Sequence, residues 1–166
     1  SKGARMYGLQ AEAHFDGAHF LTNYYGKCEN LHGHRWRVVA TIEVEDLQDG
    51  TNGEGALRDD GTVTNDGTMR DMVIDFGVFK RIVAEVADEL DHTFLVEEGS
   101  LAPATVTALE NEGFTLTMLP FRTTAENLAR WFFDRLAERN LPISQIEVDE
   151  TPNNRAFYAR EGHVGR

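Results

Sequence analysis

The sequence predicts an α+β fold, in which two helices pack on one face of a four-stranded antiparallel sheet. The hydropathy pattern along the chain indicates the order strand, strand, helix, helix, strand, strand. The 166 residues, of which 41% are hydrophobic and 27% charged, suit a single globular domain over 1–166. No predicted element covers the other face of the sheet, so a partner subunit is expected there.

The first two strands are expected at 6–20 and 32–45. In segment 6–20, apolar and polar residues alternate and aromatic residues are frequent. Segment 32–45 contains many β-branched residues. The loop of about ten residues between them favours an antiparallel pair. Residues 46–72 are crowded with glycine and aspartate and are expected to form a long hairpin insertion. Their aspartates do not follow EF-hand spacing, so a calcium site is not favoured.

The first helix is expected after the segment MVIDF (72–76), because apolar residues recur at helical spacing as far as Leu90. The second helix is expected to begin at Thr123, since Thr123 and Glu126 have the spacing of a capping box. Its apolar stripe is interpreted as core and comprises Leu128, Trp131, Phe132 and Leu136.

The remaining segments carry weaker patterns. Residues 93–122 look irregular, with a short helix around 104–111. The second long helix is expected to stop near Asn140 and Pro142. Residues 143–160 then predict two strands that flank a turn at 152–154.

The net charge of −12 and the pI of about 4.8 argue against binding to nucleic acid or an anionic membrane. A small anionic substrate would need a local basic cluster, for which the candidates are Lys27, Arg35, Arg37, Lys80, Arg81 and Arg122. The single cysteine, Cys28, cannot form an internal disulfide, which fits a reducing cytoplasm. No apolar run is long enough to span a bilayer.

Histidines in the first two strands predict a metal site. His32 and His34 are two residues apart, so in a strand both side chains lie on one face and can reach one ion. His19, at the end of the preceding strand, is the favoured third ligand, and His14 ranks slightly below it. Three imidazoles leave the fourth position of zinc open, as in catalytic sites.

Other polar residues admit more than one interpretation each. Cys28 is a fourth metal ligand, a small buried residue, or a thiolate base that Lys27 would favour. Asp91 and His92 form either a polar helix terminus or a proton relay. Glu150 is either a solvent-facing strand residue or a carboxylate that accepts two N–H bonds from a heterocycle.

The motifs together resemble the 6-pyruvoyl-tetrahydropterin synthase family. They occur in the family's order and cover most of the chain, which makes the combination specific although no single motif is. The matching segments are FDGAHF (15–20), KCENLHGH (27–34), MVIDF (72–76), LDHTFL (90–95), TTAENLARWFF (123–133) and VDET (148–151).

The resemblance implies roles for individual residues. It implies a zinc ion on His19, His32 and His34. Proton transfer would fall to Cys28 on one side of the substrate and to the pair Asp91 and His92 on the other. Glu150 would anchor the pterin ring, with a less certain contact from Thr123 or Thr124.

The resemblance also implies an assembly and a reaction. The family's tunnelling fold forms a barrel of three subunits, and two trimers stack into a hexamer with active sites between subunits. Three residues separate Cys28 from His32, as in the bacterial carboxy-tetrahydropterin branch of queuosine biosynthesis, whereas the animal branch typically has five. The implied reaction converts 7,8-dihydroneopterin triphosphate to 6-carboxy-5,6,7,8-tetrahydropterin.

Alternatives to this reaction are a pyruvoyl-tetrahydropterin synthase or a related pterin side-chain lyase, and a zinc-stabilised oligomer that has lost catalysis. The sequence departs from the compact family pattern in two longer segments, 46–72 and 96–121. It also departs at Thr123, where the family often has proline.

Overall fold

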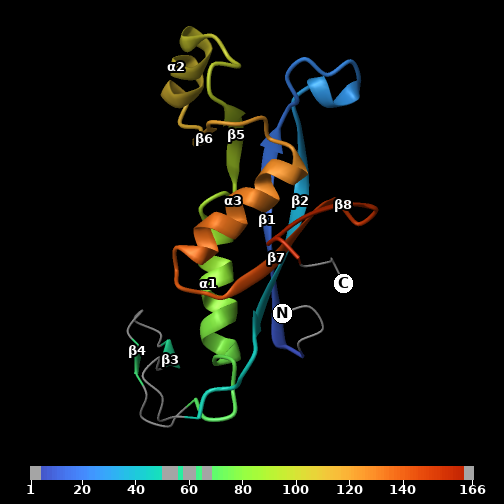
Figure 1. The fold of residues 1–166 in the computed structure, drawn as a ribbon. Helices are drawn as coiled ribbons and strands as arrows, with labels where there is room; N and C mark the ends of the chain where they lie inside the picture. Colours follow the sequence, from blue (N-terminus) through green and yellow to red (C-terminus); the bar gives the residue numbers. More distant parts are fainter. Residues whose placement is uncertain (1–4, 50–55, 58–62, 65–68, 163–166) are drawn as a thin grey trace.

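The computed structural model describes residues 5–49, 56–57, 63–64 and 69–162. Six strands form one sheet in the order β6-β5-β1-β2-β7-β8, and β3 and β4 form a separate pair (Figure 1). The strands are β1 Tyr7–His19, β2 His32–Val44, β3 Ala56–Leu57, β4 Val63–Thr64, β5 Thr93–Glu97, β6 Leu116–Leu119, β7 Ile143–Thr151 and β8 Asn154–Ala159. The helices are α1 Phe76–Asp88, α2 Pro103–Asn111 and α3 Ala125–Ala137, with a 3-10 turn at Lys27–Glu29.

The α+β class is confirmed, but the predicted numbers of four strands and two helices are wrong. The four expected strands, β1, β2, β7 and β8, form an antiparallel sheet, and β5 and β6 extend it beyond β1 in parallel. Segment 93–122 is therefore not irregular, although its short helix, α2, was expected. The strand β5 contains only five residues, too few for hydrophobic periodicity to identify them as a strand.

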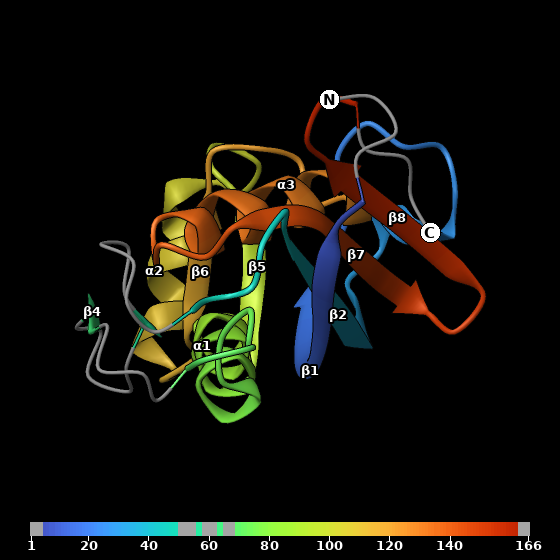
Figure 2. The same ribbon diagram turned by 60° about the horizontal axis from the view of Figure 1, so that its bottom comes forward.

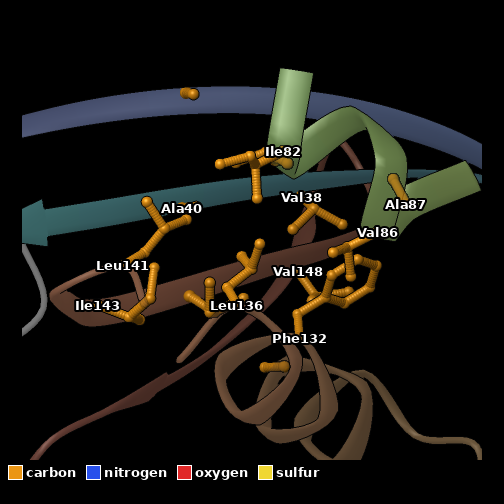
Figure 3. Close-up of a cluster of buried hydrophobic side chains, with 14 of the residues drawn as sticks. Val38, Ala40, Ile82, Val86, Ala87, Phe132, Leu136, Leu141, Ile143 and Val148 are labelled. Atoms are coloured by element: carbon orange, nitrogen blue, oxygen red, sulfur yellow. The ribbon is translucent and has the colours of Figure 1, made fainter. Parts of the chain in front are cut away.

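The core lies between the sheet and two helices, α1 on β1 and α3 on β7 and β8 (Figures 1 and 2). Figure 3 shows side chains of this layer, among them Val38 from β2, Val86 from α1 and Phe132 from α3. The rings of Phe15 and Trp36 stack with their centroids 5.7 Å apart. Phe132 is buried as predicted, whereas Trp131 is only partly buried.

The start of α3 differs from the predicted capping box by one residue. Thr124 is the N-cap, and its hydroxyl accepts a hydrogen bond from the Asn127 amide at 3.2 Å. Thr123 instead lies inside the protein with 1% of its surface exposed. The error follows from the TT doublet, because either threonine offers the same hydroxyl to the first turn. The shift leaves Thr123 free to contact the end of β1.

The hairpin expected at 46–72 is described only in part. β3 and β4 form an antiparallel pair, and the rest of that segment between 50 and 68 lies outside the described residues. Among the helices that the structure describes, none is long and apolar enough to cross a membrane.

Candidate metal centre and proton relay

Three histidines meet where β1 ends and β2 begins. His19 and His32 are opposite each other in the β1–β2 register, and His34 lies two residues further along β2. The three ring centroids are 4.7 to 5.3 Å apart. One nitrogen from each ring lies within 4.8 Å of the other two, close enough to share an ion. The other candidate ligand, His14, is opposite Arg37 and does not belong to this group.

Main-chain carbonyl groups orient two of the rings. His19 Nδ1 lies 2.8 Å from the Thr123 carbonyl oxygen, and His32 Nδ1 lies 2.6 Å from that of Asn30. Because a carbonyl oxygen only accepts hydrogen bonds, both Nδ1 atoms carry the proton. Each Nε2 is then a lone-pair donor, which is the arrangement typical of metal-binding histidines.

The Nε2 atoms of all three histidines are buried and make no hydrogen bond to the described part of the protein. A convergent set of unsatisfied lone pairs fits a cation and is costly without one. Burial lowers the pKa of His19 to about 4, and burial also lowers the pKa of His34. Both rings are therefore neutral at neutral pH, as metal ligation requires. The donor set fits zinc.

Glu150, near the end of β7, lies beside this group. Its Oε1 is 3.5 Å from Nε2 of His34, and about a fifth of its side chain is exposed. The carboxylate is therefore partly buried beside the three histidines.

Cys28 lies in the 3-10 turn of the loop between β1 and β2. The loop is closed by a hydrogen bond of 2.7 Å from the Leu21 amide to the Cys28 carbonyl oxygen. The thiol is free and half-buried, and it is not among the group of ligand atoms around the three histidines. This placement favours a free thiol over a fourth metal ligand.

Asp91 and His92 form a rigid pair at the end of α1. One carboxylate oxygen of Asp91 accepts a hydrogen bond from the Asp16 amide, and the other carboxylate oxygen lies 2.8 Å from His92 Nδ1. The His92 amide donates to the Asp16 carbonyl at 2.7 Å, which holds His92 at a φ of 57°. That angle is uncommon outside glycine. The amide of Asp16, followed by the His92 ring, lowers the pKa of Asp91, and the Asp91 carboxylate raises the pKa of His92.

The pair predicts a pH-dependent contribution to stability. Asp91→Asn should lower the pKa of His92, because the asparagine keeps the shape and removes the charge. The native pair stabilises the fold most between the ordinary pKa values of aspartate, 3.8, and histidine, 6.5. The stabilisation is lost as pH falls through the lowered pKa of Asp91, or rises through the raised pKa of His92. NMR titration of the His92 ring and urea unfolding against pH measure both effects. An unchanged His92 titration in the variant would contradict this assignment.

The Asp91–His92 pair, which is the candidate relay, and the histidine group lie on opposite sides of the sheet. Side chains alternate along a strand, so His19 and Asp16 project to opposite faces of β1. Asp16 shares its face with Arg35, whose Nη1 is 3.4 Å from both carboxylate oxygens. Asp16, Asp91 and His92 offer ligand atoms within 4.8 Å of one another, which places the relay on the Asp16 side.

A cleft of about 660 Å³ opens beside the relay. Its polar wall includes Asp16, Arg35 and His92. Its apolar wall includes Leu109 of α2 and Phe114, so part of the longer segment 96–121 borders the candidate site. Both of these side chains belong to a segment with no family motif, which is why sequence patterns did not indicate them.

The sequence matches a known family along most of its length. A family model described as 6-pyruvoyl tetrahydropterin synthase matches residues 8–161. A 6-carboxy-5,6,7,8-tetrahydropterin synthase of Haemophilus influenzae is 34% identical over 156 residues, which cover 92% of this chain and 99% of that protein. The protein of the same name from Synechocystis is 28% identical over 155 residues, which cover 92% of this chain and 93% of that protein.

Solved structures show the same fold. An uncharacterised protein of Wolinella succinogenes superposes with a TM-score of 0.68 at 22% identity, covering 95% of this chain and 99% of that one. The 6-pyruvoyl tetrahydropterin synthase of Plasmodium falciparum gives a TM-score of 0.58 at 22% identity, with 92% and 96% covered. The family predicted from the motifs is thus confirmed, and this chain belongs to the 6-pyruvoyl tetrahydropterin synthase family.

Proposed function

We propose that this protein is a zinc-dependent lyase that converts 7,8-dihydroneopterin triphosphate and water to 6-carboxy-5,6,7,8-tetrahydropterin, with release of acetaldehyde and triphosphate. The observation that carries the proposal is the group of three buried, unsatisfied Nε2 atoms at the end of β1, within a chain of this family. The names of the relatives and the three-residue gap between Cys28 and His32 favour the carboxy product. The queuosine pathway and a cytoplasmic location stay predictions.

His19, His32 and His34 would hold the zinc ion, with Thr123 and Asn30 fixing two of the rings through their carbonyl groups. When bound, zinc would polarise the hydroxyl groups of the substrate side chain and lower their pKa. His19 and His34 stay neutral in the fold because burial lowers their pKa, so the chain presents these two ligands in their binding form.

Two groups would move protons. The thiolate of Cys28 would take a proton from the substrate side chain on the face that the β1–β2 loop covers. His92 would hold or give a proton at Nε2, while Asp91 holds its Nδ1 proton and favours the charged ring. Glu150 would accept two N–H bonds from the amino-pyrimidinone edge of the pterin. Thr124 caps α3 and Thr123 contacts His19, so their hydroxyls would contact the pterin only secondarily.

Product identification tests the proposal. The zinc-loaded protein is incubated with 7,8-dihydroneopterin triphosphate, and the pterin is identified by chromatography and mass spectrometry. Formation of the 6-carboxy product supports the proposal. Formation of 6-pyruvoyl-tetrahydropterin would instead identify the protein as a pyruvoyl-tetrahydropterin synthase. Zinc binding without any turnover would favour the inactive oligomer.

The opposite positions of relay and metal group suggest that two copies of the chain build each site. Cys28→Ala and His92→Ala variants should each be inactive as homo-oligomers. When they are mixed through reversible subunit dissociation, some sites receive an intact Cys28 from one chain and an intact His92 from another. Partial recovery of product formation is therefore expected. Mixed oligomers, identified by native mass spectrometry, that show no activity would contradict a shared site.

A further inference from the structure

Arg122 lies next in the chain to the residue that orients His19, and it has no role in the chemistry above. It directly precedes Thr123, whose carbonyl orients His19. The Arg122 carbonyl accepts hydrogen bonds from the Thr124 amide at 2.8 Å and from the Asn127 side chain at 3.0 Å. The root of the side chain is therefore held by the first turn of α3.

The guanidinium group of Arg122 reaches the loop that carries Cys28. Its central carbon lies 5.9 Å from the centroid of the Tyr24 ring, within the range of a cation–π interaction. Tyr24 belongs to the loop that the hydrogen bond from Leu21 to Cys28 closes. Arg122 thus connects the helix start that orients a metal ligand with the loop that positions the thiol.

Two nitrogens of this group are buried without a partner. Nε and Nη2 of Arg122 make no hydrogen bond to the described residues, and no described carboxylate lies within 4.0 Å. Other arginines are paired: Arg37, Arg135 and Arg139 reach carboxylate oxygens at 3.0, 2.7 and 2.8 Å. A buried N–H of a cation is costly unless an acceptor satisfies it, so the orphaned pair indicates an absent acceptor.

The geometry of the two atoms defines that acceptor. Nε–H and one Nη2–H lie on the same edge of the planar guanidinium and point in parallel, which matches two oxygens of a phosphate or carboxylate. The net charge of −12 would otherwise repel a small polyanion, so such a ligand needs a cation that no carboxylate occupies.

We propose that the Nε–Nη2 edge of Arg122 binds an oxyanion, and that this oxyanion is a phosphoryl group of the triphosphate that leaves the substrate. The general site rests on the unsatisfied edge alone, whereas the identity of the ligand rests on the proposed function. Among the other basic candidates, Arg37 is paired with Asp149, Arg81 with Glu85 and Arg35 with Asp16.

Binding of inorganic triphosphate to the zinc-loaded protein, measured by isothermal titration calorimetry, tests the site directly. Arg122→Gln should weaken binding by a factor of ~10–100, because two charge-assisted hydrogen bonds are lost. Arg122→Lys keeps the charge but not the paired edge and should fall between wild type and Arg122→Gln. Zinc content should stay at the wild-type level in both variants.

Arg130→Gln is the matched control. Arg130 also lies 5.9 Å from a tyrosine ring, that of Tyr158, so its replacement removes the same charge and a similar cation–π contact. It should leave triphosphate affinity unchanged. Equal weakening by Arg122→Gln and Arg130→Gln would overturn the site, since only net charge would then matter. Unchanged affinity in Arg122→Gln, or no binding by the wild type, would also overturn it.

The assay separates this inference from the proposed function. If triphosphate binding depends on Arg122 but no pterin product forms, the anion site stands and the lyase proposal fails. If product forms, Arg122→Gln should raise KM for the triphosphate substrate and lose inhibition by inorganic triphosphate. An Arg122→Gln variant that dissociates the oligomer yet keeps wild-type triphosphate affinity would show that a carboxylate of a partner subunit, and not the ligand, satisfies the edge.

Discussion

The Cys28→Ala variant is expected to lose ~10²–10⁴-fold in turnover while it binds as much zinc as the wild type. A positioned proton-transfer group contributes a factor of this size. The metal content should not change, because the thiol is not among the ligand atoms around the three histidines. Turnover of 7,8-dihydroneopterin triphosphate and metal analysis by mass spectrometry measure the two properties on one preparation.

The Cys28→Ser variant is the control for loop structure. The hydroxyl is close in size to the thiol but remains protonated at neutral pH, so the variant should fold and bind zinc but turn over slowly. Loss of zinc from either variant would show that Cys28 is a fourth metal ligand, which leaves no open coordination position for the substrate. Full activity of Cys28→Ala would remove the thiol from the mechanism.

Removal of His32 is expected to abolish specific zinc binding. Wild-type protein should gain ~2.7 kcal/mol of stability at free zinc 100-fold above its dissociation constant, because the folded state alone presents the three ligands. His32→Ala should gain almost nothing under the same conditions. Urea unfolding with and without zinc measures the difference. His32 is only partly buried, so its replacement should leave the apo fold intact.

His14→Ala is the matched control for this experiment. His14 lies on β1, the strand that pairs with β2, is exposed, and belongs to no group of possible ligands among the described residues. It should bind a full complement of zinc and show the full stabilisation. A His32→Ala variant that retains zinc, or a His14→Ala variant that loses it, would refute the assignment of the metal centre.

The sequence predicted the parts of the fold that regular periodicity determines. Long alternating segments marked β1 and β2, and once these pair, the geometry of a strand brings His32 and His34 to one face. Short elements were missed, because the five residues of β5 and the four of β6 are too few to show a period. The count of strands failed for this reason.

The candidate site was predictable where it depends on spacing and on family motifs, and unpredictable where it depends on contacts through space. The carbonyl group of Asn30 orients His32, yet its side chain gives no signal for this role. Asp16 holds the relay through its main-chain atoms. Arg122 stood among six basic candidates in the sequence, and only its unsatisfied buried nitrogens distinguish it.

The main contact between residue 123 and His19 depends on the backbone of residue 123 and not on its side chain. The principal acceptor, 2.8 Å from His19 Nδ1, is a main-chain oxygen that every amino acid supplies, proline included. The Thr123 hydroxyl, at 3.2 Å, is an additional partner. Proline at this position would therefore preserve the principal acceptor of the His19 ring. The path of the backbone thus sets the orientation of this ring, so the side chain of residue 123 and the geometry of the candidate ligand can vary independently.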